Sequence, residues 1–329
     1  MSTQQSNKLA VVSAVINASI IGLSFLFMKS ALQSADPFTA LAYRFILSFL
    51  VLSIPVALGW IKIDLRGKSL RPIFGMAILY PTLFFALQAF GLQHASSAEG
   101  GILYAFTPVL TVLFAGYFLK ERTTLKQKLA IALSVFGVLF VVIMKGTKLD
   151  MSHFAGIILL FLSVLSFSGY SVFARKLSSQ FRPIELTYIM MAIGSVAFGA
   201  MALIQHGASG TMEQLIEPLT IGSFWIAILY LGLLSSLISL LLQTYTLSKM
   251  EASKMSVFSN LATVVSMIGG VLVFGEQITM YDILGSIMII VGVIGTLVWG
   301  KRKPAPAQAA LPKINSNAAK PSPQIHANQ

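Results

Sequence analysis

The sequence predicts an all-α integral membrane protein, and three observations support this: its composition, the lengths of its apolar runs and an internal repeat. Of the 329 residues, 56% are hydrophobic and only 10% are charged, and the mean hydropathy is +0.82. A soluble domain has about 25% charged residues on which to build a water-facing surface. Because this chain has less than half of that share, most of its exterior must face lipid.

Ten apolar runs in the chain are long enough to cross a bilayer. A helix needs about 20 apolar residues to span the roughly 30 Å of hydrocarbon. The first run exceeds the core of a signal peptide and no A-x-A-like cleavage site follows it, so we expect it to be retained. The tail at 304–329, rich in Pro, Ala, Ser and Asn, is predicted to be disordered. The ten runs are 9–31, 37–60, 71–92, 97–119, 126–144, 153–175, 183–205, 221–247, 254–274 and 280–300.

The positions of lysine and arginine predict the orientation of these spans. Of the 23 basic residues, Arg44 falls within a span, and Lys29, Lys145 and Lys148 fall on one side of the membrane. The remaining nineteen fall on the side of the N-terminus, which the positive-inside rule places in the cytoplasm. We therefore predict a multi-pass protein of the bacterial plasma membrane with both termini cytoplasmic. Most of the net charge of +12 comes from this bias and a basic tail, so it does not indicate nucleic-acid binding.

An internal repeat divides the chain into two halves of five spans. An offset of 155 residues aligns Glu121 with Glu276 and Gly137 with Gly292. The same offset pairs Gln88 with Gln243, while GLSFLFMK (22–29) resembles GYSVFARK (169–176) at a different offset. Because five is odd, the second half must insert upside down. The prediction is two inverted five-helix repeats, at 9–144 and 153–300, an arrangement typical of carriers that alternate access to a site near the membrane midplane.

Several segments resemble one known family. These are PFTALAYRF in the second span, ILYAFTPVLTVLFAGYFLKERTT followed by ALSVFGVLFV, and NLATVVSMIGGVLVFGEQIT followed by GSIMIIVGVIG. They are similar to the EamA family of the drug/metabolite transporter superfamily, over about residues 10–300. The resemblance implies a ten-helix exporter or permease of small metabolites, often amino acids or related compounds. One departure is that Thr263 stands where the first repeat has Pro108.

Arg44 is the most informative single residue. An arginine inside a span costs at least ~2.5–3.5 kcal/mol on insertion scales, so it should face a polar cavity or a partner. One interpretation is that it contacts a carboxylate of the substrate. The other is that it reaches towards the outer interface or binds backbone carbonyls.

Other polar side chains near mid-span are candidates to line the same cavity. Each could instead face a neighbouring helix, which is the commoner role of such residues. Pro81 and Pro108 interrupt the third and fourth spans and free backbone carbonyls. Gln88 and Gln243 either hydrogen-bond between helices, which we favour, or line vestibules. The candidate set is Asn17, Ser24, Tyr80, Tyr104, Ser235, Ser236, Tyr245 and Asn260.

Acidic residues gather at the ends of the spans. His94 and Glu99 flank the outer start of the fourth span, where they form either a gating or proton-coupled pair or ordinary interfacial polarity. Glu121 and Glu276 lie just past helix ends, and we expect both to be structural. The threonines three residues after them, Thr124 and Thr279, are expected to cap the following helices.

The distribution of reactive groups argues against catalysis. We find no paired carboxylates converging on a pocket and no metal-ligand spacing among the four histidines, so no enzyme activity, metal or cofactor is expected. We expect a carrier of a small metabolite that works by alternating access and exports its solute. The alternatives are an importer or facilitator of the same solutes, and a non-transporting scaffold or sensor. The expected partners are the solute and the bilayer, and the sequence leaves a homodimer open.

Overall fold

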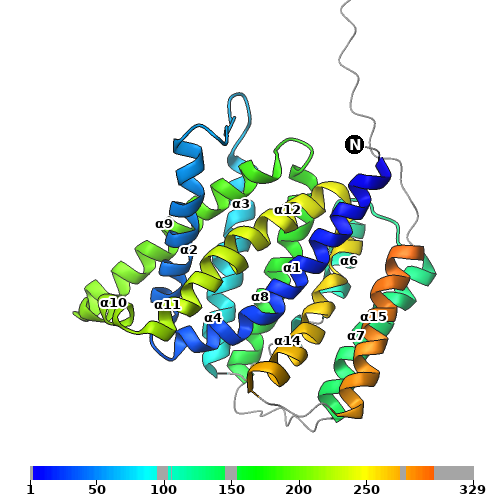
Figure 1. Cartoon of the computed structure of the whole chain (residues 1–329). Helices are drawn as coiled ribbons and strands as arrows, with labels where there is room; N and C mark the ends of the chain where they lie inside the picture. The colour runs from blue at the N-terminus through cyan, green and yellow to red at the C-terminus, as the bar shows by residue number, and fades with distance from the viewer. Residues whose placement is uncertain (1–2, 95–102, 105, 145–153, 275–278, 300–329) are drawn as a thin grey trace, which may run out of the picture.

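The structure, a computed structural model, is a bundle of α-helices (Figure 1). It describes residues 3–94, 103–104, 106–144, 154–274 and 279–299, and this part of the chain contains no β-strand. Each of the ten apolar runs overlaps a helical segment. The expected tail at 304–329 lies outside the described residues.

Within the described residues, the first half of the chain contains five helical segments. The third is interrupted and consists of α3, η1 and α4 in succession. The segments are α1 (Thr3–Leu32), α2 (Pro37–Ala57), α3 (Arg71–Ala77) with η1 (Ile78–Leu83) and α4 (Phe84–His94), α6 (Thr107–Phe118) and α7 (Leu125–Met144).

The second half follows the same plan. Its third segment is again interrupted. Two short helices, α10 and η3, come directly before this segment. The segments are α8 (Phe154–Leu177), α9 (Pro183–Ser209), α10 (Glu213–Ile216), η3 (Glu217–Thr220), α11 (Gly222–Leu229) with η4 (Tyr230–Ile238) and α12 (Ser239–Lys249), α13 (Ala252–Met255), α14 (Phe258–Phe274) and α15 (Met280–Trp299).

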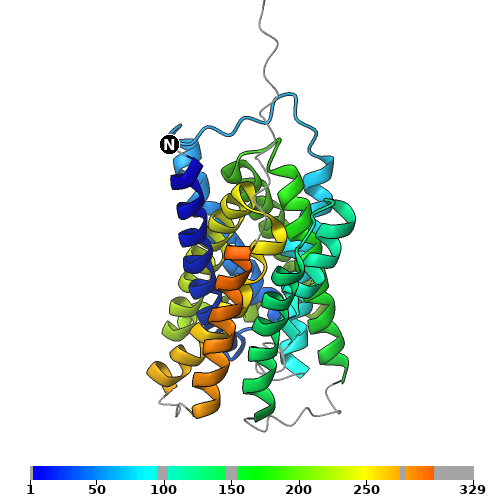
Figure 2. The same ribbon diagram turned by 90° about the vertical axis from the view of Figure 1, so that its right-hand side faces the viewer.

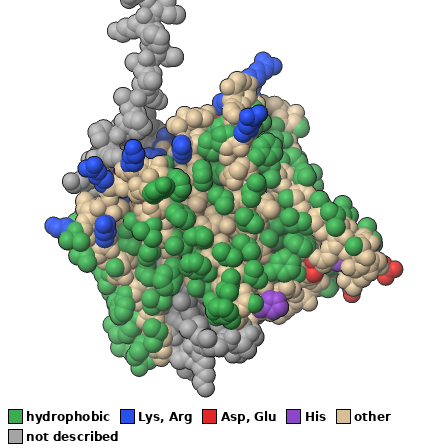
Figure 3. All heavy atoms as spheres, turned by 180° about the vertical axis from the view of Figure 1, so that it is seen from behind, with side chains coloured by type: hydrophobic (Ala, Val, Ile, Leu, Met, Phe, Trp, Pro, Cys, Tyr) green, Lys and Arg blue, Asp and Glu red, His purple; other side chains and the backbone are tan. Residues whose placement is uncertain are grey.

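Six helical segments in the described part of the chain are long and apolar enough to cross a membrane. Large apolar side chains such as Leu50, Val196 and Ile204 are exposed on the outside of the bundle. Figure 3 shows this apolar surface, with Lys and Arg gathered towards one end. The protein is therefore a multi-pass membrane protein. The six segments are Lys8–Leu32, Pro37–Ala57, Arg71–His94, Phe154–Leu177, Pro183–Ser209 and Gly222–Lys249.

Local sequence explains where two of the helices begin. Asp36 caps α2, because its carboxylate accepts hydrogen bonds from the backbone N–H of Phe38 (3.0 Å) and Thr39 (3.2 Å). Thr124 caps α7, since its hydroxyl accepts from the N–H of Gln127 (3.2 Å) while the Gln127 side chain accepts from the N–H of Thr124 (3.3 Å). Such reciprocal bonds satisfy N–H groups that have no partner inside the helix.

The two interrupted segments are irregular where they pass through the bundle. Tyr80, directly before Pro81, has extended backbone angles inside η1 (φ −148°, ψ 122°). The wide π-type turns of η4 have a comparable place in the second half. Pro108, in contrast, lies in the first turn of α6, where a proline is well tolerated. The expected interruption at Pro81 is therefore inside a helical segment, whereas Pro108 stands at the beginning of a helix.

The helices of one half pack mainly on those of the other half. α1 packs against α12 and α14, while α8 packs against α4 and α6. α2 pairs with α9, and α7 pairs with α15. Figure 2 shows α7 and α15 side by side and running in opposite directions. The interior between α1, α4, α8 and α12 is where the candidate site lies.

Candidate functional site

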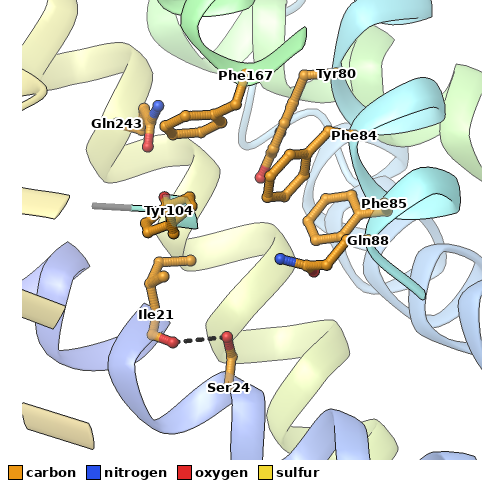
Figure 4. Close-up of a pocket in the computed structure, with 9 residues that line it drawn as sticks. All are labelled: Ile21, Ser24, Tyr80, Phe84, Phe85, Gln88, Tyr104, Phe167 and Gln243. Atoms are coloured by element: carbon orange, nitrogen blue, oxygen red, sulfur yellow. Dashed lines mark hydrogen bonds between the residues drawn. The ribbon is translucent and has the colours of Figure 1, made fainter. Parts of the chain in front are cut away.

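Two adjoining small hollows lie between the halves of the bundle, and together we call them the central cavity. They share four lining residues, Ile21, Tyr104, Phe167 and Gln243. Their volumes are about 10 and 20 Å³, which is room for about one water molecule each. A metabolite would therefore have to push side chains apart. Figure 4 shows the first hollow, lined by Ile21, Ser24, Tyr80, Phe84, Phe85, Gln88, Tyr104, Phe167 and Gln243.

Aromatic rings form most of the wall of the central cavity. Phe167 on α8 lies 5.2 Å from Phe84 on α4 and 5.6 Å from Tyr104, measured between ring centres. Tyr80 lies 5.3 Å from Phe84 and stacks on Tyr170 at 4.5 Å. Rings at these distances attract one another in tilted and stacked geometries. The wall is thus a connected group of rings drawn from both halves.

A chain of amide and hydroxyl groups crosses the other side of the cavity. The Ser239 hydroxyl donates to Asn17 Oδ1 (2.6 Å), and Asn17 Nδ2 donates to Gln243 Oε1 (3.2 Å). Gln243 is only 4% exposed, and its Nε2 has no hydrogen-bond partner. A buried N–H without a partner costs about 1–3 kcal/mol, and this atom has less than 1 Å² of accessible surface.

Arg44 lies beside the cavity rather than in its wall. The side chain is 2% exposed, and it donates from Nε to the Ser236 hydroxyl (2.5 Å) and from Nη2 to the Ser235 hydroxyl (3.0 Å). Its guanidinium carbon is 4.1 Å from the centre of the Phe85 ring, which lines the cavity. Among the described residues Arg44 has no ion pair. It is therefore buried among neutral partners, one ring away from the cavity.

The structure separates the sequence-predicted cavity residues into two groups. Asn17, Ser24, Tyr80 and Tyr104 line the central cavity. Arg44, Ser235, Ser236, Tyr245 and Asn260 do not appear in its wall. Asn260 donates instead to the Ser134 hydroxyl on α7 (3.0 Å). Gln88 and Gln243, for which the sequence favoured a packing role, both line the cavity, and Figure 4 shows them at opposite ends of the group of rings.

The predicted helix-end residues have varied surroundings. The Glu121 carboxylate accepts from the N–H of Ala252 (3.2 Å) and from the N–H and hydroxyl of Ser253 (3.3 and 2.6 Å). It thus binds the start of α13 in the other half, and not the helix that follows it in sequence. His94 ends α4 with an exposed side chain. Glu99 and Glu276 lie outside the described residues.

One buried polar cluster was missed by reasoning from the sequence. His206, 1% exposed near the end of α9, has Nε2 at 3.0 Å from Asp36 Oδ2 and 2.9 Å from the Thr39 hydroxyl. Its Nδ1 is 2.8 Å from the Thr211 hydroxyl. The cluster fastens the start of α2 to the end of α9. In the sequence, His206 appears only as a histidine near the end of a span. The sequence does not indicate its partners, because Asp36 and Thr39 are about 170 residues away.

Fold and cavity together define a class: a multi-pass helical membrane protein with a buried site between two interlocked sets of helices. The chain matches the EamA-like transporter family twice, over residues 8–143 and 154–298. It belongs to this family and is a membrane transporter, which confirms the resemblance seen in the sequence.

The names of related proteins also describe membrane transporters. The chain is 46% identical over 287 residues to the "Uncharacterized transporter YcxC" of Bacillus subtilis (strain 168), covering 87% of this chain and 92% of that protein. It is 24% identical over 292 residues to the "Probable amino-acid metabolite efflux pump" of Escherichia coli (strain K12), covering 86% and 92% of the two chains. A solved crystal structure with 18% identity superposes with a TM-score of 0.72 over 92% of this chain and 100% of that one, and it supports the fold alone.

Proposed function

We propose that the protein exports small metabolites, such as amino acids or related compounds, across the bacterial plasma membrane by alternating access. The observation that carries this proposal is the central cavity, whose wall is built from helices of both halves. If the halves rock against each other, a cavity between them opens to one side and then to the other. The outward direction and the solute class draw on the named function of the Escherichia coli relative.

We propose further that the ten helical segments form two inverted five-helix repeats, at 9–144 and 153–300, with both termini in the cytoplasm. Two family matches, one in each half, support the repeat. The opposite directions of α7 and α15 support the inversion, since they are the fifth segments of their halves (Figure 2). Lys and Arg gathered towards one end of the surface in Figure 3 support the orientation.

Within this mechanism, Asn17, Ser24, Tyr80 and Tyr104 contact the cargo directly, because they line the cavity. Arg44, held by Ser235, supplies a positive charge behind the Phe85 ring. A rotation of Phe85 would bring that charge within reach of a cargo carboxylate. Asn260 supports the packing of α14 on α7.

Reconstituted transport tests the proposal. Purified full-length protein in proteoliposomes is expected to show saturable flux of at least one solute from a broad panel of amino acids and related metabolites, with protein-free liposomes as the control. The absence of flux for the entire panel would favour a scaffold or sensor. A comparison of the culture medium from cells with and without the protein tests direction, because an exporter enriches its solute outside whereas an importer depletes it.

A further inference from the structure

We infer that Glu121 is the latch of a gate, formed by α13 and the residues that follow it, which closes the central cavity towards the end of the bundle where Lys and Arg gather. Glu121 is thus a positioning residue that sets how often the cavity opens to this side, and it does not touch the cargo. The inference rests on the proposed function and deepens it, because alternating access requires a gate on each side of the cavity.

The gate segment, residues 252–259, forms part of the cavity wall. Met255, Ser256, Phe258 and Ser259 from this segment line the second hollow. The segment follows α12, which ends at the same end of the bundle as the N-terminus (Figure 1). The gate segment therefore lies between the cavity and this end of the bundle.

The start of α13 is capped from the other half of the chain. The first N–H groups of a helix have no partners inside the helix, and Glu251, directly before α13, gives it no side-chain cap within the described part of the chain. The Glu121 carboxylate accepts instead from the N–H of Ala252 (3.2 Å) and from the N–H and hydroxyl of Ser253 (3.3 and 2.6 Å). Because Ala252 and Ser253 are buried, separating the halves here would break these bonds and expose both residues.

The charged groups around this contact come mostly from the second half. The guanidinium of Arg175, near the end of α8, lies close enough to the carboxylates of Glu121 and Glu251 to attract both. Its Nη1 donates to the carbonyl oxygen of Leu247 (2.7 Å), in the last turn of α12. Glu251 pairs with Lys254 in α13 (3.2 Å). Of the two acids, Glu121 alone belongs to the first half, so its contacts are the ones that break when the halves separate at this end.

The pair α2 and α9 provides a contrast, because it is tied at both ends. At one end Arg182 donates to the carbonyl oxygen of Lys62 (2.5 Å), and Lys68 pairs with Glu185 (2.7 Å). The other end holds the cluster around His206. Two helices that are tied at both ends cannot separate at one end alone, so we expect α2 and α9 to move as a unit. A cross-link between Lys62 and Arg182 is therefore a control for one between Glu121 and α13.

The labelling of single cysteines tests the latch, since the chain has no cysteine of its own. Ser259→Cys in the gate segment reports opening of the gate. Ala202→Cys, buried in α9 outside the cavity wall, reports general loosening of the fold. In full-length protein in detergent, Glu121→Gln is expected to raise the labelling rate of Ser259→Cys about tenfold, because it loses charge-assisted hydrogen bonds, and that of Ala202→Cys by less than about twofold.

Two further variants separate the latch from the charge of its surroundings. Ser253→Ala removes the shortest of the three bonds but keeps both N–H groups, so it should raise labelling of Ser259→Cys about two- to threefold. Glu251→Gln removes an acid from the same region, but that acid pairs with Lys254 within the second half. Labelling in Glu251→Gln should therefore stay close to that of wild type.

A reversible cross-link tests whether the contact opens during transport. The double variant Glu121→Cys/Ser253→Cys is joined with a short bifunctional methanethiosulfonate reagent, which a reducing agent cleaves. Joining should lower proteoliposome flux at least about tenfold, because a carrier that cannot open to one side cannot complete its cycle, and reduction should restore the flux. The same treatment of Lys62→Cys/Arg182→Cys should leave most of the flux intact.

Failure of this inference differs from failure of the proposed function. The inference is overturned if Glu121→Gln raises labelling of Ala202→Cys as much as that of Ser259→Cys, or raises neither, or if the joined double variant keeps its flux. A carrier would stand in each of these cases. If wild type carries no solute in the panel but the labelling difference is found, the proposed function fails, while Glu121 still holds the gate segment closed.

Discussion

Arg44 shows how a positive charge can be kept inside a membrane protein with no carboxylate paired to it among the residues that the structure describes. Two serine hydroxyls and an aromatic face surround it, and all of them are neutral. Neutral acceptors and rings compensate the loss of hydration only in part. The charge is therefore not cancelled and stays available to an anionic group, which is the physical reason to connect it with transport.

Substitutions of Arg44 are expected to separate charge from geometry. Arg44→Ala should reduce proteoliposome flux at least tenfold. Arg44→Lys should have nearly as little flux, because a lysine ammonium group lacks the planar, forked geometry with which the guanidinium binds both serines. Arg44→Met, of similar volume, serves as the folding control. Membrane abundance is measured alongside flux. Normal flux at normal abundance in Arg44→Ala would show that the residue has no part in transport.

The contact between Asp36 and His206 concerns stability rather than cargo. Burial raises the pKa of Asp36, but hydrogen bonds from Thr39 and His206 lower it by more, so the pKa lies below its usual value of 3.8. A carboxylate with a depressed pKa stabilises the folded protein at any pH above its unfolded value. That stabilisation is lost as the pH falls through the folded value.

Asp36→Asn is therefore expected to lower the unfolding temperature at neutral pH. The gap between wild type and variant should begin to narrow below about pH 3.8, the usual pKa of the carboxyl in the unfolded chain, and should close as the pH falls through the lower pKa of the folded protein. Thermal unfolding in detergent across this range measures the gap, with Glu213→Gln as a control at an exposed acid. A gap that persists unchanged at pH 3 would mean that the charge of Asp36 contributes nothing.

At the scale of elements, α7 and α15 are held together by close backbone approach. A Cβ built at Gly292 would lie 2.6 Å from the carbonyl oxygen of Ala130, and one at Gly137 would lie 2.9 Å from that of Gly285. The two glycines that the sequence repeat aligns thus have equivalent places on opposite sides of one interface. No larger residue fits at either position unless the helices move apart.

Gly292→Ala is expected to destabilise the protein by about 1–3 kcal/mol, the usual cost of overpacking. The matched control is Gly75→Ala in α3, where a Cβ would meet nothing within 4 Å. Because alanine has a higher helix propensity than glycine, this variant should be slightly more stable than wild type. Unfolding in a denaturing detergent compares the two variants with wild type. Equal stability of both variants would show that α7 and α15 are not packed as closely as described.

The elements were predictable to different degrees. Apolar run length placed the helical segments, and local signals placed the Thr124 cap and the interruption at Pro81. The binding of Glu121 to α13 was not predictable, because Ser253 lies 132 residues further along the chain. A capping residue can be read from its neighbours, but a bond between two halves depends on how they pack.

At the scale of the whole molecule, the proposed inversion places equivalent turns on opposite sides of the membrane. The chain contains no cysteine, so single cysteines can be introduced and labelled without background. Thr123→Cys should react only with a reagent supplied from the cytoplasmic side, and Gln277→Cys only with one supplied from outside. Ser316→Cys in the tail is the control and should behave like Thr123→Cys. Labelling of Thr123→Cys and Gln277→Cys from the same side would contradict the inverted arrangement.

The sequence by itself determined that the protein lies in a membrane, where its apolar helices run and to which family it belongs. These features depend on composition, run length and motifs, all of which are local properties of the chain. Only the tertiary structure decided that Gln88 and Gln243 face one cavity, that Asn17 holds Gln243 across 226 residues and that Arg44 lies behind Phe85. A polar group inside a span is stabilised by a partner, and helix packing selects which partner it meets, because packing alone brings distant side chains within hydrogen-bonding distance.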